Sequence, residues 1–388
     1  MRTSVNHLLA AVTVAALVLG ACSDDSESEA AATTADASTK TSAVSATTEP
    51  GADETAATDA TGAAKTEAVP AGTERAGPVD NEISIVGFAV PEAANKAIAE
   101  AWAQTPNGAD VRFKTSYGAS GDQSRAVVDG LDADYVHFSV ASDVTRLVAE
   151  GLVAEDWADG DNSGVVSSSI VVFAVREGNP LGIATWEDLI EPGVEIVTPN
   201  PASSGSARWN ALAAWGQVIE SGGTEEQAAE YVTEFFENVV ALPNSGRDAT
   251  TAFLGGTGDV LMAYENEAIL ARQNGEVFDY IIPETTILIE NPGAVLIDAN
   301  PKATEWLNFV LSGDGQREFA LKGFRPIVAG VEFGEVEGAN DPANPFPEII
   351  NLLTVADDFG SWSDLSDKFF NEDNGIVTQI ILASGKAE

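Results

Sequence analysis

Strand-like and helix-like patterns alternate along the chain from about residue 82 onward. Residues 83–88 (ISIVGF) alternate as a strand does, and residues 91–103 (PEAANKAIAEAWA) have helical spacing with a proline in the first turn. Further strands are expected at 111–115, 133–140, 168–175, 194–198, 239–242, 258–264 and 294–297, and further helices at 123–131, 143–150, 207–219, 225–238, 250–254, 265–273, 304–311, 315–321, 362–370 and 377–382. This order predicts an α/β fold in which helices flank a mostly parallel sheet.

Three turns rich in serine and glycine each lie between an expected strand and an expected helix. They span residues 116–123 (SYGASGDQ), 201–209 (PASSGSARW) and 244–250 (NSGRDAT). Helix N-termini carry unpaired N–H groups and a positive dipole end, so they favour anions. Ligands of open parallel sheets bind beyond the carboxyl ends of the strands. The first turn belongs to the early strands and the others to a block from about 170 to 279, which predicts two lobes with the ligand in the cleft between them.

The chain is strongly acidic, with a formal net charge of -42. This charge argues against nucleic-acid binding and against adhesion to an anionic membrane surface. It also repels an anion at long range, so affinity for one has to come from local contacts. No Cys/His cluster has zinc spacing, and we expect neither a metal nor a cofactor. His137 lies in an apolar run, where a buried core or cleft-edge histidine is expected in preference to a ligand.

The first 80 residues carry a different pattern. Residues 1–21 are typical of a secretory signal, with an eleven-residue apolar core at 8–18. The sequence LGAC at 19–22 looks like a lipobox, which predicts acyl chains on Cys22, the one cysteine of the chain. An ordinary signal with an incidental cysteine is the alternative. Residues 22–80 are rich in Ala, Thr, Ser and acidic residues, which predicts a disordered tether with a reach of roughly 40 Å.

Several long motifs resemble the solute-binding proteins of sulfate/thiosulfate ABC importers, from about residue 82 to the C-terminus. The motifs are SYGASGDQSR (116–125), GLDADYVHFSVASDV (130–144), VVFAVREGNP (171–180), WEDLIEPGVEIVTPNPASSGSARWNALAAWG (186–216), SGRDATTAFL (245–254), GDVLMAYENEAILA (258–271) and FRPI (324–327). The resemblance implies a two-lobed periplasmic-binding-protein fold that closes on one tetrahedral dianion. It also implies an ABC permease as partner, an extracytoplasmic location and, for this lipoprotein form, a membrane anchor.

In that family the anion is held by backbone N–H groups, a serine hydroxyl and an indole N–H. Carried over by motif, the expected ligand-binding residues are Ser120, Gly121, Ser204, Gly205, Ser206, Gly246 and Tyr264, with Ser204 as a hydroxyl donor. This chain departs from the commoner pattern where Tyr264 replaces tryptophan, Ser206 replaces glycine and Val90 replaces aspartate. These departures leave the choice among sulfate, thiosulfate, molybdate, tungstate, phosphate and other tetrahedral anions open. An oxyanion sensor of the same fold, which would differ only in its partner, is a separate alternative.

A surrounding set of charged residues is expected to order the turns without touching the ligand. Arg208 and Arg247 lie within one helical turn of a Ser/Gly start, whereas Arg125 could equally be solvated. Glu265 and Glu267 are expected to face away from the dianion in ion pairs, because a fully ionised sulfate offers no proton to a carboxylate.

An enzyme is not expected, because Ser120 and Ser204 have no evident general base or metal in the sequence. We expect a monomer. One lobe should comprise residues 81–169 plus 280–388, and the other should comprise residues 170–279.

Overall fold

The computed structural model describes residues 81–386, which belong to one compact unit. The predicted signal peptide, Cys22 and the tether lie outside the described residues. None of the helices within residues 81–386 combines the length and the apolar character needed to cross a membrane.

One continuous sheet runs through the described chain in the order β2-β1-β3-β9-β4-β7-β5-β6, with β10 paired to β9 and β8 paired to β4. Its strands are β1 Glu82–Phe88, β2 Arg112–Gly118, β3 Tyr135–His137, β4 Val165–Val175, β5 Ile196–Val197, β6 Val239–Ala241, β7 Val260–Tyr264, β8 Asp279–Ile281, β9 Thr285–Val295 and β10 Asn351–Leu353. The groups β2-β1-β3 and β7-β5-β6 are parallel. Strands β4 and β9 run antiparallel to their main neighbours and connect the two parallel groups.

The helices begin closer to the strands than the sequence pattern suggested. They are α1 Glu92–Trp102, α2 Ser120–Val128, α3 Ala141–Ala149, α4 Gly205–Glu220, α5 Glu225–Asn238, α6 Gly246–Leu254, α7 Glu265–Gln273, α8 Lys302–Val310, α9 Gly313–Leu321, α10 Trp362–Phe370 and α11 Ile376–Ala383, with a 3₁₀ turn η1 Glu187–Ile190 and a π turn η2 Val355–Phe359. Helices α2, α4 and α6 start at Ser120, Gly205 and Gly246, two to four residues before the expected positions. The Ser/Gly turns are therefore the first turns of helices.

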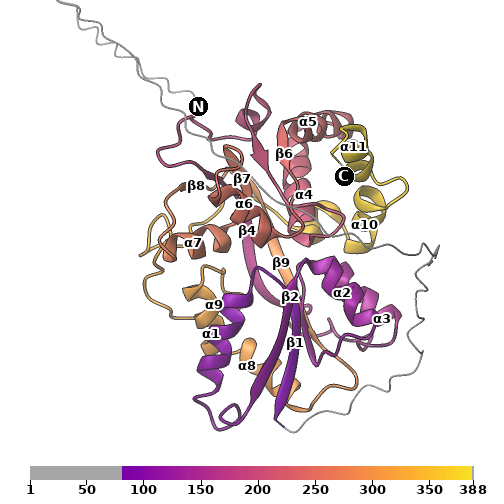
Figure 1. Ribbon diagram of the computed structural model, residues 1–388, viewed down its shortest axis with the longest axis vertical. Coiled ribbons are helices and arrows are strands. Elements are labelled where there is room, and N and C mark those ends of the chain that lie inside the picture. The colour runs from indigo at the N-terminus through magenta and orange to yellow at the C-terminus, as the bar shows by residue number, and fades with distance from the viewer. Residues whose placement is uncertain (1–80, 387–388) are drawn as a thin grey trace, which may run out of the picture. The chain divides into compact units, whose positions relative to one another are not determined.

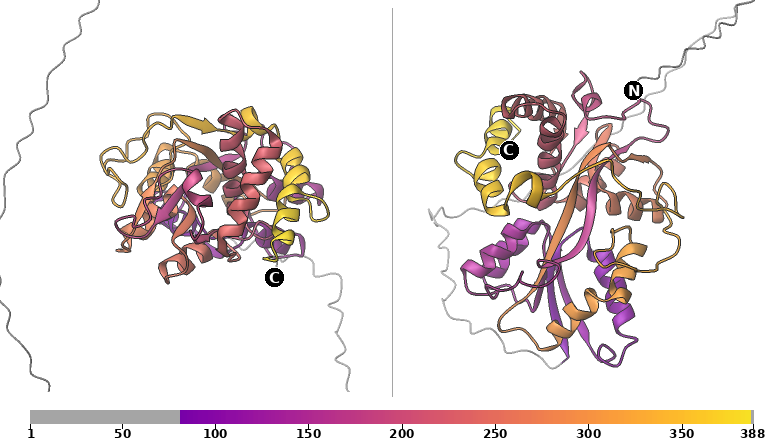
Figure 2. Two further views of the ribbon diagram at one scale, coloured as in Figure 1. Left: turned by 90° about the horizontal axis from the view of Figure 1, so that it is seen from above. Right: turned by 180° about the vertical axis from the view of Figure 1, so that it is seen from behind.

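The chain forms two lobes, which are connected by the long strands β4 and β9 (Figures 1 and 2). In one lobe β1–β3 lie between α1, α8 and α9 on one side and α2 and α3 on the other; in the second lobe β5–β7 carry α4 to α7. The first half of β4 pairs with β9, and its second half pairs with β7. The α/β, two-lobed architecture predicted from the sequence is confirmed.

Strand β9 is much longer than the expected strand at 294–297, because it continues through Pro292 and Gly293. Proline and glycine normally argue against a strand interior. Here a Cβ on Gly293 would collide with the Tyr135 hydroxyl, so the position requires glycine for close packing against β3. The strand thereby brings Asn291, which is fully buried, into the centre of the molecule.

The C-terminal helices pack on the second lobe, as the yellow ribbons of Figure 1 show. Trp215 of α4 meets the ring of Phe369 of α10 edge-on at 4.9 Å, and Lys368 pairs with Glu225 of α5 at 2.7 Å. Helix α10 also contacts α3 of the first lobe. The predicted lobe boundaries stay a prediction. However, α10 and α11, which were expected in the lobe of residues 81–169 and 280–388, lie against α4 and α5 of the lobe of residues 170–279.

His137 is a fully buried residue of the core, as expected. Its Nδ1 lies 3.3 Å from the side chain of Asn95 and its Nε2 lies 3.1 Å from Ser167 Oγ. Phe88 and Phe319 meet its ring edge-on. Burial lowers the pKa of His137 to about 3, so the imidazole is neutral at physiological pH.

Candidate functional site

The starts of α2, α4 and α6 approach one another across the two lobes. The Gly121 N–H donates to Ser203 O at 3.0 Å, and Asn244 Nδ2 donates to Asp122 Oδ2 at 2.9 Å. A Cβ added to Gly246 would lie 2.9 Å from Ser206 Oγ. The three Ser/Gly turns that the sequence singled out are therefore brought together, and the positive ends of three helices meet there.

Gly205 lies in the tightest of these contacts. A Cβ at this position would lie 2.6 Å from both Cβ and Oγ of Ser139 and 3.2 Å from Val140 Cγ1. Real Cβ contacts are essentially never shorter than 3.0 Å. Only glycine therefore allows α4 to approach the loop after β3 this closely.

The side chain of Ser120 connects α2 to α3. Its Oγ accepts a hydrogen bond from the Ser139 N–H at 2.9 Å and donates one to Asp143 Oδ2 at 2.6 Å. Its proton is thus already engaged by a carboxylate. The sequence placed Ser120 among the ligand-binding residues; in this geometry its contribution to anion binding would come from the backbone N–H in the first turn of α2.

Ser204 differs from Ser120 in how its hydroxyl is used. It is the N-cap residue of α4 and is 2% exposed, yet its side chain caps no backbone N–H of that helix. An N-cap serine usually accepts such a bond. Its hydroxyl is therefore not used to stabilise the helix start, which is consistent with the predicted role as an anion donor.

Tyr264 ends β7 and is fully enclosed. Its hydroxyl lies 2.7 Å from Ser139 Oγ, and the side chains of Ser206 and Asn291 are its other polar neighbours. Burial raises the pKa of Tyr264 far above its usual value, so the hydroxyl keeps its proton. The tyrosine that replaces the family tryptophan is thus one member of a buried group of hydroxyls.

Ser139 was not among the predicted site residues, although it makes four bonds at the centre of the site. Besides the two bonds to Ser120 and Tyr264, its carbonyl accepts from Trp209 Nε1 at 2.9 Å and from Asn291 Nδ2 at 3.0 Å. One signal was available in the sequence. Ser139 lies near the carboxyl end of the expected strand 133–140, directly before a helix, as the three Ser/Gly turns do.

Both glutamates at the start of α7 form ion pairs. Glu265, fully buried, receives bonds of 2.7 and 3.1 Å from Arg325, and Glu267 receives bonds of 2.9 and 2.7 Å from Arg247. Burial raises the pKa of Glu265, and Arg325 opposes that shift. Arg247 also donates to Val90 O at 3.2 Å and so ties α6 to the loop that follows β1. Both glutamates are thus engaged in ion pairs, and that they face away from a bound anion stays a prediction.

The two other arginines differ in their surroundings. Arg208 donates to Pro201 O at 3.2 Å and stacks over the Phe370 ring at 5.2 Å, and burial lowers its pKa. It therefore contacts the loop that precedes α4, and its supporting role in anion binding stays a prediction. Arg125 forms a half-exposed pair with Asp122 within α2.

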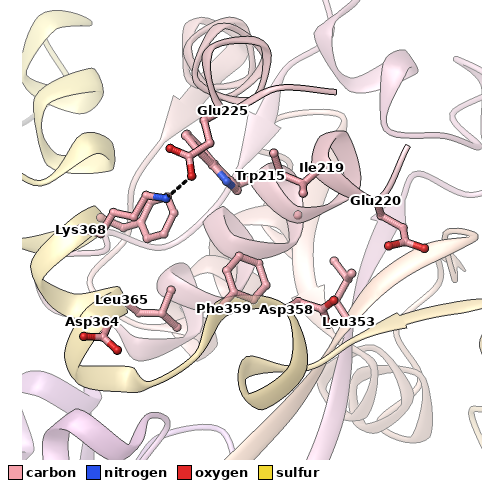
Figure 3. A pocket seen from close by; sticks show the side chains of 12 residues that line it. Trp215, Ile219, Glu220, Glu225, Leu353, Asp358, Phe359, Asp364, Leu365 and Lys368 are labelled. Carbon is pink, nitrogen blue, oxygen red and sulfur yellow. Dashed lines mark hydrogen bonds and ion pairs between the residues drawn. The ribbon is translucent and has the colours of Figure 1, made fainter. Parts of the chain in front are cut away.

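A separate cavity of about 230 Å³ lies between α4, α10 and the turn η2 (Figure 3). Trp215, Phe359 and Leu365 form its apolar wall, and the Lys368–Glu225 pair closes one side. None of the predicted anion-binding residues lines it. Within residues 81–386, no group of three His, Cys, Asp or Glu side chains is arranged to hold a metal ion.

Comparison with known proteins assigns the family. Residues 83–325 match the model of the bacterial extracellular solute-binding proteins. The sulfate-binding protein of Synechococcus elongatus is 42% identical over 303 residues, which cover 75% of this chain and 84% of that protein. The thiosulfate-binding protein of Pseudomonas aeruginosa is 35% identical over 301 residues, covering 74% and 86%.

A solved structure agrees with the sequence relatives. The sulfate-binding protein SubI from Mycobacterium tuberculosis H37Rv superposes with a TM-score of 0.70 at 40% identity, covering 75% of this chain and 100% of that one. The chain therefore belongs to the family of bacterial extracellular solute-binding proteins, together with the sulfate-binding and thiosulfate-binding proteins just named.

Proposed function

We propose that this protein is the extracytoplasmic binding component of an ABC importer for sulfate, and that it also takes thiosulfate. The relatives that it resembles along three quarters of its length are named sulfate-binding and thiosulfate-binding proteins. Bound anion would lie between the lobes, against the first turns of α2, α4 and α6. Backbone N–H groups at Ser120, Gly205, Ser206 and Gly246 and the hydroxyls of Ser204 and Tyr264 would hold it. The Gly121 N–H, which the sequence placed among the donors, already donates to Ser203 O, so Gly121 would serve by letting the two turns approach closely.

The observation that carries this proposal is the convergence of three helix N-termini at a place where the neighbouring carboxylates are occupied. Glu265 and Glu267 are paired with arginines, and Asp143 accepts from Ser120 and from Arg146. Donors in excess of acceptors suit a fully ionised dianion, because it has lone pairs to accept hydrogen bonds and no proton to give.

The same reasoning predicts discrimination against phosphate. Hydrogen phosphate brings a proton that needs an acceptor, and a buried donor left without one costs roughly 1–3 kcal/mol. Because 1.4 kcal/mol corresponds to about tenfold in affinity, phosphate should bind about 5- to 150-fold more weakly than sulfate on this ground alone.

Calorimetric titration of the purified protein with sulfate, thiosulfate, molybdate and phosphate near neutral pH tests the proposal. We expect sulfate to bind and phosphate to bind much more weakly. Perchlorate is a control for charge, since it is tetrahedral and donor-free but carries one negative charge. Tighter binding of phosphate than of sulfate would contradict the assignment. Tightest binding of molybdate would favour the alternative of an importer for another tetrahedral oxyanion.

We propose a binding role without catalysis, in which the closed protein delivers its anion to permease subunits. A sensor of the same fold would bind the same anion and differ only in its partner. Loss of sulfate uptake in a deletion strain, restored by the intact gene, supports transport. Normal uptake with a lost sulfate response would favour the sensor.

We also propose that the mature protein is a monomer anchored to the outer face of the membrane by acyl chains on Cys22. The strongly acidic chain would then stay near the membrane through its lipid and not through charge. Membrane fractionation of the protein and of Cys22→Ala tests the anchor. An equal distribution of both forms would contradict it, and sedimentation of the detergent-purified protein tests the monomer.

A further inference from the structure

The hydroxyls of Ser139 and Tyr264 meet across the two lobes, 2.7 Å apart and buried. Ser139 follows β3 in the first lobe, and Tyr264 ends β7 in the second, 125 residues further along the chain. Either oxygen can be the donor. This contact adjoins two of the Ser/Gly turns, at Ser120 and Gly205, and its chemistry differs from that of an indole.

An indole N–H has a fixed direction and can only donate, whereas a phenol O–H rotates and can donate or accept. A tyrosine at this position therefore gives the anion a reliable donor only if a neighbour fixes the direction of its proton. Ser139 Oγ is close enough to do so. With Ser139 donating to Tyr264, the phenol proton is left for a third group.

The position of Ser139 is itself fixed from three directions. Its N–H is bound by Ser120 Oγ, and its carbonyl is bound by Trp209 Nε1 and Asn291 Nδ2 at 2.9 and 3.0 Å. Behind Asn291 the chain of bonds continues through Ser167 to His137. Asn291 donates its amide N–H to Ser139, so its oxygen accepts from Ser167, which in turn accepts from His137 Nε2–H. The backbone of Ser139 is thus held by a network with one consistent direction, and only its hydroxyl is left to act on the tyrosine.

We propose that Ser139 is a positioning residue for anion binding, which orients the Tyr264 hydroxyl so that the two side chains act as one donor toward the ligand. The inference rests on the proposed anion-binding function and adds a residue to it. It also explains the departure at Tyr264: the serine and the tyrosine together supply what a lone indole N–H supplies by itself.

A double-mutant cycle on sulfate affinity, measured by calorimetry with the full-length protein in detergent, tests this proposal. Ser139→Ala keeps the backbone bonds and removes only the hydroxyl, and Tyr264→Phe keeps the ring. Each single variant should weaken sulfate binding by roughly tenfold, as expected for one hydrogen bond to a charged group. The double variant should be no weaker than the weaker single variant, because the second change removes nothing further.

A rescue variant separates orientation from simple packing. In a Tyr264→Trp background the indole N–H needs no partner, so adding Ser139→Ala should change the sulfate affinity less than about twofold. Ser168→Ala is the matched control: its hydroxyl bonds to Arg325 O at 2.8 Å away from the Ser/Gly turns, and its loss should leave affinity unchanged. Thermal unfolding of each anion-free variant checks that the fold is retained.

Three outcomes overturn the inference, and the third of them also overturns the proposed function. If the two single effects multiply in the double variant, or if Ser139→Ala is equally harmful in the Tyr264→Trp background, the residues do not act as one donor, while the proposed function stands. If the unaltered protein binds no tetrahedral anion, the proposed function fails together with the inference.

Discussion

Replacing Gly205 with alanine is expected to weaken anion binding without destabilising the protein. Gly205 is the first residue of α4, and its added Cβ would lie 2.6 Å from Cβ and Oγ of Ser139. These atoms belong to different lobes. The methyl group therefore opposes closure of the lobes, because its three nearest atoms, in Ser139 and Val140, all belong to the first lobe.

The magnitude follows from the contact. The new Cβ is about 1 Å too close to two atoms of a side chain whose backbone is held by Ser120, Trp209 and Asn291, so it cannot simply move aside. Overpacking of this kind costs about 1–3 kcal/mol. If the cost falls on the closed state alone, the dissociation constant for sulfate rises by about 5- to 150-fold. Stability of the anion-free protein should stay equal or rise by up to about 1 kcal/mol, because alanine favours a helix over glycine.

Gly313→Ala is a matched control for this prediction. Gly313 also begins a helix, α9, but a Cβ there would meet nothing within 4 Å. Calorimetry with sulfate and thermal unfolding without it should be run on both variants. Unchanged sulfate affinity of the Gly205→Ala protein would show that this glycine is not what allows the closed contact. Equal loss of affinity in the Gly313→Ala protein would show that the effect is not specific to the contact.

Three further predictions test the surroundings of the site. Ser204→Ala should weaken sulfate binding by about 1–3 kcal/mol and leave the free energy of unfolding unchanged, because the Ser204 hydroxyl caps no N–H. Ser312→Ala removes a cap of α9, so it should lower the free energy of unfolding by about 1 kcal/mol and leave sulfate affinity unchanged. Glu267→Gln should lower the free energy of unfolding by roughly 2 kcal/mol, because it breaks an ion pair whose carboxylate is buried. The loss is moderate because Arg247 keeps a third of its side-chain surface in water. An unchanged midpoint in urea titrations would contradict this. His137 has a pKa of about 3 in the fold and 6.5 when unfolded, so below pH 6.5 the unfolded chain binds a proton that the folded chain does not. Lowering the pH from 7 to 5.5 should therefore reduce the free energy of unfolding by about 1.2 kcal/mol. The His137→Gln protein should lack this loss.

The sequence predicted the order and type of most elements because their patterns are local. Residues 225–238 and 362–370 become helices with those bounds, and the Ser/Gly turns do lie at the carboxyl ends of strands. The helix starts were placed too late because Ser and Gly weaken a helical pattern, although small residues suit a first turn where neighbours approach closely. The same feature that concealed the helix starts marks the candidate site.

The parts that could not be predicted depend on contacts between distant segments. The sequence marks Ser139 only as a serine near the end of an expected strand, and its role follows from meeting Tyr264, 125 residues away, and Asn291, 152 residues away. The extension of β9 through Pro292 and Gly293 depends on the shape of Tyr135 in a neighbouring strand. Likewise, the engagement of the Ser120 hydroxyl by Asp143 depends on how α2 packs beside α3.

We propose that neutral donors hold a dianion at this site and that no group in contact with it titrates near neutral pH. The most direct test is the dissociation constant of sulfate measured by calorimetry from pH 6 to pH 8. Sulfate stays fully ionised in this range, the histidine of the core stays neutral, and Tyr264 stays protonated. Sulfate affinity should stay constant within about twofold and exceed phosphate affinity at every pH. A tenfold change in sulfate affinity across the range would show that a titrating group takes part in binding, and phosphate binding that overtakes it would show that the site accepts a proton from its ligand.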